Sequence, residues 1–221
     1  ARYEEAVERY ADDSRADRAV FMLADAYRRN AAQLLVDLDD PRNAARRESL
    51  RHMRLQRLQR SRKLYDETIR RFQARETRMT EELDELYVRL SHFYRADVVC
   101  DLAYDGETMD PRGVAEAIEL YDRAAWLYQQ DPMALNAYVQ MISCHLRLGQ
   151  VDQARMTLQR ARWAMKGISD EAFLRHAPQE DRTFWETYLD WLESTPTLAG
   201  APAAAEAEAG NLDRAGQRHA G

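Results

Sequence analysis

The stretch YVQMISCHLRLGQVDQARMTLQRA, residues 138–161, decides the fold. Apolar residues recur at helical spacing on both sides of Gly149, and a glycine between two helices can end the first with a positive φ that other residues resist. Ala154 and Ala161 put small side chains on the second half, where they let two helix backbones approach closely. The stretch therefore predicts two helices folded against each other as a hairpin.

The composition favours helices along the whole chain. Its 221 residues are 45% hydrophobic and 32% charged, with only 8 glycines and 6 prolines, and no strand-like alternation of β-branched residues occurs. A chain of this length can form one large or two small domains, and this one is apolar enough to bury a core. We therefore expect an all-α protein.

Three Asp-Pro pairs, at 40–41, 110–111 and 131–132, mark expected helix starts. The Asp side chain can cap the free N–H groups of a helix, and Pro fits the first helical position. A break is expected near 77–80, because arginines precede it and acidic residues follow it, as the helix dipole favours. We expect helices at 2–12, 16–38, 42–76, 80–103, 112–130, 133–147, 150–167, 170–176 and 179–194. Residues 195–221 have little to bury, so we expect a disordered Ala-, Gly- and Pro-rich tail.

The hairpin pattern recurs, more loosely, in other parts of the chain. The residues that carry it are FMLADAYRR (21–29), FYRADVVCDL (93–102) and AIELYDRAAWLYQQDPMALNAYVQM (117–141). Through them the chain resembles the tetratricopeptide repeat (TPR) family, and in detail the bacterial cell-envelope TPR proteins, such as the lipoproteins of outer-membrane barrel assembly. The resemblance implies a right-handed α-solenoid over 1–194, with an elongated hairpin at 16–76, hairpins at 80–130 and 133–167, and a capping helix at 179–194.

The resemblance also implies a function. TPR proteins are scaffolds that bind a protein or peptide in a concave groove lined by the first helix of each hairpin. The resemblance to the envelope proteins implies a role in bacterial envelope assembly in the periplasm, with the cytoplasm as the alternative compartment. The groove-lining positions would be Arg18, Phe21, Asp25, Arg28, Arg29, Leu90, Phe93, Asp97, Asp101, Asn136, Val139, Ser143 and Arg147.

A basic segment offers a different kind of site. Residues 42–78 contain 13 arginines or lysines against 4 acidic residues, a net charge of +9, while the whole chain carries −6. Through Arg47, Arg51 and Arg54 such a helix could bind nucleic acid or the anionic surface of a membrane. Because aromatic residues are not interleaved and the rest of the chain is acidic, we favour arginines that pair with acidic residues of the same chain, and nucleic-acid binding is unfavoured.

An apolar stripe with heptad spacing leaves oligomerisation open. It could form a coiled coil between two copies or pack inside the solenoid, so both a monomer and a homodimer remain possible. Its members are Leu55, Leu58, Tyr65, Ile69, Phe72, Met79, Leu83, Leu86, Leu90 and Phe93.

Nothing in the sequence indicates catalysis, a metal or a cofactor. The five histidines and two cysteines have no metal-ligand spacing, and neither a phosphate-binding loop nor a nucleophile elbow occurs. We therefore expect that the protein is not an enzyme. Cys100 and Cys144 lie in helical patterns and are expected to be buried thiols, and the aromatic residues between 173 and 192 are expected to cover the last hydrophobic face.

Overall fold

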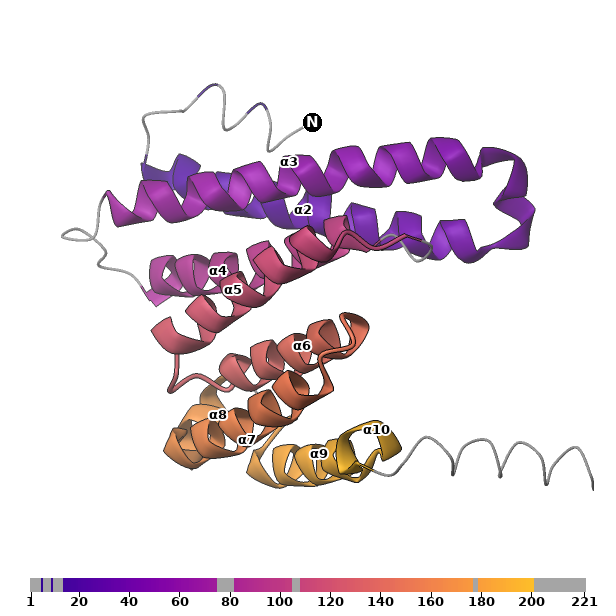
Figure 1. Ribbon diagram of the computed structural model, residues 1–221. Coiled ribbons are helices and arrows are strands. Elements are labelled where there is room, and N and C mark those ends of the chain that lie inside the picture. The colour runs from indigo at the N-terminus through magenta and orange to yellow at the C-terminus, as the bar shows by residue number, and fades with distance from the viewer. Residues whose placement is uncertain are drawn as a thin grey trace, which may run out of the picture.

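The structure is a computed structural model that describes residues 5, 9, 14–74, 82–104, 108–176 and 179–200. In these ranges it contains no strand, which confirms the expected all-α class, and an isolated bridge joins Tyr104 to Met109. The helices are α2 (Ser14–Asp39), the 3-10 helix η1 (Pro41–Arg46), α3 (Arg47–Gln73), α4 (Glu82–Ala103), α5 (Pro111–Leu127), α6 (Met133–Arg147), α7 (Val151–Gly167), α8 (Asp170–His176), α9 (Arg182–Ser194) and α10 (Pro196–Ala199) (Figure 1).

All three Asp-Pro pairs start a helical segment, as predicted. At each pair the Asp carboxylate accepts a hydrogen bond from the backbone N–H two residues later, at 2.9 Å for Asp40, 3.1 Å for Asp110 and 2.8 Å for Asp131. These bonds satisfy N–H groups that have no partner within the helix.

The expected helix at 42–76 is divided in the structure. Its first turn and a half is the 3-10 helix η1, and α3 begins only at Arg47. The expected break near 77–80 lies outside the described residues; on either side of it α3 ends at Gln73 and α4 begins at Glu82. Of the expected helix at 2–12, only Glu5 and Arg9 lie in the described part of the chain, and both are helical.

The hairpin at 138–161 is confirmed as α6 and α7. Gly149 has φ 71°, the left-handed conformation expected of a glycine between two helices. Ala154 and Ala161 are completely buried, because their small side chains lie where α7 contacts the rest of the core.

Each long helix packs mainly against its neighbours in the sequence. The pairs α2–α3, α4–α5 and α6–α7 therefore lie in successive layers, and α2 also contacts α4, as α4 contacts α6 (Figure 1). One hydrophobic core joins α2, α3 and α4 around Tyr65, and another extends from α4 to α10 around Leu135 and Leu158. Helix α4 contributes to both cores, so it connects the two ends of the molecule.

Helix α9 closes the second core. Trp185 and Leu189 are buried there, and Phe173 of α8 joins them. The start of the expected disordered tail was placed too early. Residues 196–199 form α10, Leu198 is buried, and Arg155 of α7 donates hydrogen bonds to the carbonyl oxygens of Leu198 (2.9 Å) and Thr197 (3.2 Å). The expected tail from 201 to 221 lies outside the described residues.

Among the described helices, none combines the length and the hydrophobicity that crossing a lipid bilayer requires.

Candidate partner-binding surfaces

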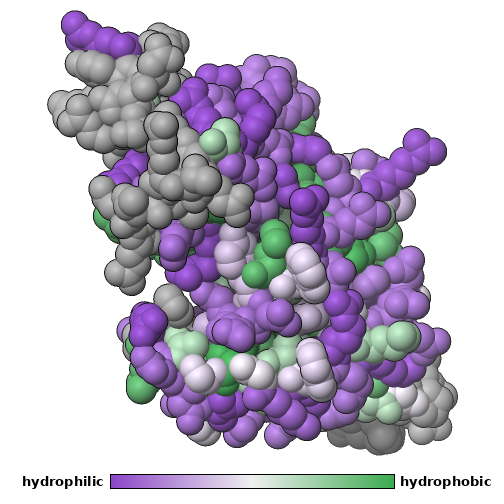
Figure 2. Space-filling model, turned by 90° about the vertical axis from the view of Figure 1, so that its left-hand side faces the viewer, coloured by the Kyte–Doolittle hydropathy of each residue, from purple (hydrophilic) through white to green (hydrophobic). Residues whose placement is uncertain are grey.

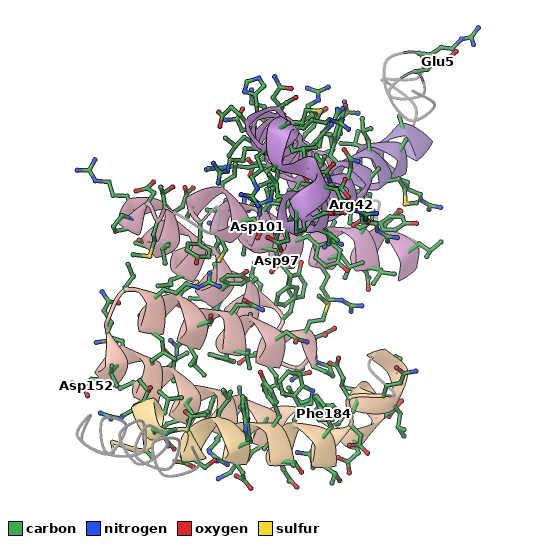
Figure 3. The ribbon with its side chains drawn as sticks, turned by 90° about the vertical axis from the view of Figure 1, so that its right-hand side faces the viewer. Glu5, Arg42, Asp97, Asp101, Asp152 and Phe184 are labelled. Atoms are coloured by element: carbon green, nitrogen blue, oxygen red, sulfur yellow. The ribbon has the colours of Figure 1, made fainter. Side chains whose placement is uncertain are left out.

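Charged side chains from three helices gather on one side of the molecule. We call this surface the α2–α4–α6 face and define it by Arg28 and Arg29 of α2, Asp97 and Asp101 of α4, and Arg147 of α6. Figure 3 shows Asp97 and Asp101 close together, next to the layer formed by α2 and α3. The contacts of α4 with both α2 and α6 bring these residues together.

Asp97 lies half-buried at the base of this face. The hydroxyl of Tyr121, on α5, donates a hydrogen bond of 2.7 Å to its carboxylate. Burial raises the pKa of Asp97 to about 6, although the bond from Tyr121 and the nearby charge of Arg28 favour the ionised form. Asp97 can therefore change its charge in a pH range where an ordinary carboxyl group stays ionised.

Asp101 lies one turn further along α4 and is more exposed. Its side chain is 49% exposed, and Nη2 of Arg54 lies 3.4 Å from its carboxylate. Desolvation by the surrounding protein raises the pKa of Asp101, with Arg54 acting against it. Arg54 is only 4% exposed and also donates to the backbone carbonyl oxygen of Asp101 (3.3 Å). The prediction that Arg54 belongs to a basic surface patch was therefore wrong, because this arginine ties α3 to α4.

Arg28 is fixed by contacts with two side chains of the same chain. Its Nη2 is 2.7 Å from the carboxylate of Asp25, and its guanidinium lies 4.0 Å from the ring centroid of Tyr94. Asp25 is buried at 6% exposure and also pairs with Nε of Arg29 at 2.7 Å. Of the two arginines, Arg29 has the exposed side chain (76%), so it is the one that a partner can reach.

Two groove positions on α2 were predicted wrongly. Phe21 is buried in the core between α2, α3 and α4, and its ring stacks on Tyr87 with centroids 4.6 Å apart. Asp25 is buried beneath its two arginines. Both face inward because α2 is covered by α3 and by α4 at once, which leaves a narrower exposed side than the repeat pattern implied.

The other predicted groove residues differ in exposure. Arg29, Asn136 and Arg147 are exposed. The prediction for Phe93 was wrong, because this residue is buried in the core that extends from α4 to α10. Arg18 is half-buried and donates from Nε to Asp84 of α4 at 2.9 Å. The remaining half-buried positions are Arg28, Leu90, Asp97, Asp101, Val139 and Ser143.

Arg147 is the charged residue of the α2–α4–α6 face that is most available to a partner. Its side chain is exposed at the end of α6, with the guanidinium 4.8 Å from the ring centroid of Tyr104 and Nη1 3.7 Å from Sγ of Cys100. No ion pair links it to a carboxylate within the described part of the chain. A cation in this state can bind an acidic group from outside without breaking an ion pair among the described residues.

Several arginines of α3 pair with acidic residues of other helices. Arg62 bonds to Glu116 of α5 at 2.5 Å, and Arg71 bonds to Asp17 of α2 at 3.2 Å. Arg47 is exposed, and Arg51 is half-buried. These contacts agree with the interpretation that the basic segment pairs with the chain's own acidic residues.

The heptad stripe is used mainly inside the chain. Leu58, Tyr65 and Phe93 are among its buried members, and they pack in the two cores. Leu55 and Leu83 remain 38% and 46% exposed. Met79 lies outside the described residues.

A second surface feature is an aromatic cavity of about 620 Å³ between α5, α6 and α7, which was not predicted from the sequence. Trp126 and Trp163 line it with exposures of 71% and 74%, large values for tryptophan. Tyr138 and Arg160 also line it, and Arg160 lies 5.4 Å from the Tyr138 ring centroid while it bonds to Asp122. Figure 2 shows the end of the molecule where α5 and α7 finish, with weakly polar and hydrophobic residues gathered between hydrophilic ones.

The signal for this cavity was present in the sequence. Residues 123–126 and 160–163 both read Arg-Ala-x-Trp, so the motif repeats after 37 positions. In each copy the alanine is buried and the tryptophan two residues later is exposed. An adjacent cavity of about 690 Å³ shares Gln129, Gln130 and Gly167 with it.

The histidines and cysteines of the described chain form no metal site. No group of three or more His, Cys, Asp or Glu side chains is placed there to hold an ion. Both cysteines are free and buried, as predicted.

Comparisons of the chain with protein-family models, with curated proteins and with solved structures find no match.

Proposed function

We propose that this protein is a TPR-like scaffold, without catalytic activity, that binds a peptide or protein partner on the α2–α4–α6 face. The sequential packing of helix pairs supports the proposal, because stacked helical hairpins form an α-solenoid in which the first helices lie side by side. In such an arrangement α2, α4 and α6 line the concave side, where extended partners bind.

The observation that carries the proposal is the row of accessible charges across three helices. Arg29, Asp101 and Arg147 are exposed or partly exposed, and Arg147 has no ion pair among the described residues. Alternating charges of this kind specify a partner by complementarity, with an acidic group opposite Arg147 and a basic group opposite Asp101. The fitting partner is therefore an extended or helical peptide of mixed charge.

The test is charge reversal at Arg147 in the full chain. Arg147→Glu should retain the wild-type melting temperature, since surface substitutions usually change stability by less than about 0.5 kcal/mol. It should nevertheless lose partners that the wild type recovers from cells producing the protein. The matched control is Arg60→Glu, an exposed arginine of α3 that is not among the residues that define this face. Equal recovery by both variants would exclude the α2–α4–α6 face as the binding site.

The aromatic cavity supports a second contact surface for the same function. Tryptophan and arginine are enriched at the residues that dominate binding energy in protein interfaces, and Trp126, Trp163 and Arg160 surround this cavity. We propose that it takes an apolar side chain of a protein partner. Trp163→Ala should weaken binding without loss of stability, whereas Met156→Ala, an exposed apolar residue of the same helix outside the cavity, should change neither. Undiminished binding by Trp163→Ala would exclude the cavity.

The envelope location is a separate proposal that rests on the resemblance of the repeat residues to bacterial envelope TPR proteins. Cell fractionation with an antibody against the protein tests it, since a purely cytoplasmic signal contradicts a role in envelope assembly.

A further inference from the structure

Two thiols meet where α4 contacts α6. The Sγ atoms of Cys100 and Cys144 are 3.7 Å apart, and both residues are buried, with exposures of 7% and 0%. A disulfide requires a sulfur–sulfur distance of about 2.0 Å. The two atoms therefore need to approach by only about 1.7 Å, a small distance compared with the movement that rotation of two cysteine side chains allows.

The surroundings shift the pKa values of the two thiols in opposite directions. A hydrogen bond between the sulfurs lowers the pKa of Cys100, helped by the guanidinium of Arg147 at 3.7 Å and opposed by burial and by the carboxylates of Asp97 and Asp101. The same hydrogen bond and burial raise the pKa of Cys144. Because the thiolate is the reactive form of cysteine, Cys100 is the nucleophile of the pair. It is also the more accessible of the two, beside the partly exposed Asp101.

We propose that Cys100 and Cys144 are an oxidative modification site, at which a hydroperoxide converts the two thiols into a disulfide between α4 and α6. In the first step the thiolate of Cys100 attacks one peroxide oxygen, the O–O bond breaks, and the second oxygen leaves with a proton as water or an alcohol. In the second step the sulfur of Cys144 attacks the resulting sulfenic acid, the S–O bond breaks, and the Cys144 proton leaves in water. The thiols lose two electrons, and the peroxide gains them.

Oxidation has two structural consequences. The new bond ties α4 to α6 and closes a loop that contains α5, which restricts the unfolded chain and raises the melting temperature. It also removes the thiolate near Arg147, so the charge pattern of the α2–α4–α6 face changes. The inference does not depend on the proposed partner, because the chemistry involves only residues within the chain.

The experiment treats the reduced, full-length protein with a small excess of hydrogen peroxide, blocks remaining thiols with iodoacetamide and measures the intact mass. We expect a product that has lost two hydrogens and carries no alkyl group, together with a linked pair of peptides containing Cys100 and Cys144. Its melting temperature should rise and should return to the starting value on reduction. A wild-type protein that keeps two alkylatable thiols, or that forms only disulfides between chains, would overturn the proposal.

Three variants separate the roles of these residues. Cys144→Ser should stop at the sulfenic acid of Cys100, which dimedone traps, whereas Cys100→Ser should react far more slowly. Arg147→Gln should slow the wild-type reaction near neutral pH, because removing the guanidinium raises the thiol pKa of Cys100 and so lowers the fraction present as thiolate. Dimedone labelling of Cys144 before Cys100 would contradict the assignment of the nucleophile, and an unchanged rate in Arg147→Gln would exclude the arginine.

Discussion

Replacing Asp97 by Asn removes a carboxyl group whose ionisation the folded protein opposes. Folding raises the pKa of Asp97 from 3.8 to about 6, mainly by desolvation. The folded state then holds a proton more tightly than the unfolded state, so the ionised carboxylate destabilises the fold. This cost is absent below pH 3.8, develops as the pH rises, and is complete above pH 6.

The magnitude follows from the size of the shift. About two pKa units correspond to about 3 kcal/mol, of which about 2 kcal/mol develops between pH 4.5 and pH 7.5. Because the side chain of Asp97 is only half-buried, solvent screening reduces the expected change to about 1–2 kcal/mol. The Asn side chain can still accept the hydrogen bond from Tyr121, so this contact should survive the substitution.

In the wild-type protein, His92 offsets the pH dependence of stability that Asp97 produces. Burial beside Arg95 and Arg123 lowers the pKa of His92 from 6.5 to about 4, so the unfolded state binds more protons there and stability rises with pH between 4 and 6.5. This trend opposes that of Asp97 over nearly the same range. The difference between Asp97→Asn and the wild type isolates the carboxylate, because His92 is present in both.

The assay is urea unfolding followed by circular dichroism at pH 4.5 and pH 7.5. Relative to wild type, Asp97→Asn should be about 1–2 kcal/mol more stable at pH 7.5 than at pH 4.5. The matched control is Asp152→Asn, a carboxylate at the start of α7 that is 89% exposed and pairs with Arg155 on the surface (Figure 3). A difference between variant and wild type that stays within about 0.5 kcal/mol across both pH values would refute the assignment of a raised pKa to Asp97.

Three further predictions test the packing and the charged surface. Ala117→Leu and Ala154→Leu should each cost about 1–3 kcal/mol in urea unfolding, because both alanines are completely buried at helix contacts; unchanged midpoints would mean that these contacts are wrong. Leu198→Ala should cost about 2 kcal/mol by the same assay. This is the low end of the cost for a buried leucine, because a terminal helix can fray, and an unchanged stability would show that α10 is not packed on the core. Duplex DNA should bind weakly and only at low salt; sub-micromolar binding at physiological salt that is lost in an Arg47→Glu, Arg51→Glu variant would instead favour the basic segment as the main site.

Local features of the sequence were sufficient to predict most of the secondary structure. Asp-Pro pairs, Gly149 and the helical spacing of apolar residues each act within a few residues, so their effect needs no knowledge of the tertiary contacts. The hairpin of α6 and α7 followed from the same local rules. The end of the fold was less predictable, because α10 depends on Arg155, more than 40 residues earlier.

The candidate site was harder to predict, because burial depends on distant partners. Helical spacing shows that α2 has an apolar stripe, but only its contacts with both α3 and α4 determine that Phe21 and Asp25 lie inside. Arg54 stands in a basic run typical of a surface, and its burial is possible because it pairs with Asp101, 47 residues away. The aromatic cavity could have been found from the repeated Arg-Ala-x-Trp motif, since an exposed tryptophan in two successive repeats indicates a shared surface.

The central claim, that a protein partner binds the α2–α4–α6 face, is tested most directly by site-specific photo-crosslinking. A photoreactive amino acid is placed at position 147 of the face, or at position 60 of α3 as the control, in cells that produce the protein. We expect ultraviolet light to crosslink a partner to position 147 and not to position 60. The same partner should be crosslinked to position 136, the exposed Asn136 of α6. Crosslinks that form at position 60 but at neither position of the face would contradict the proposed binding surface.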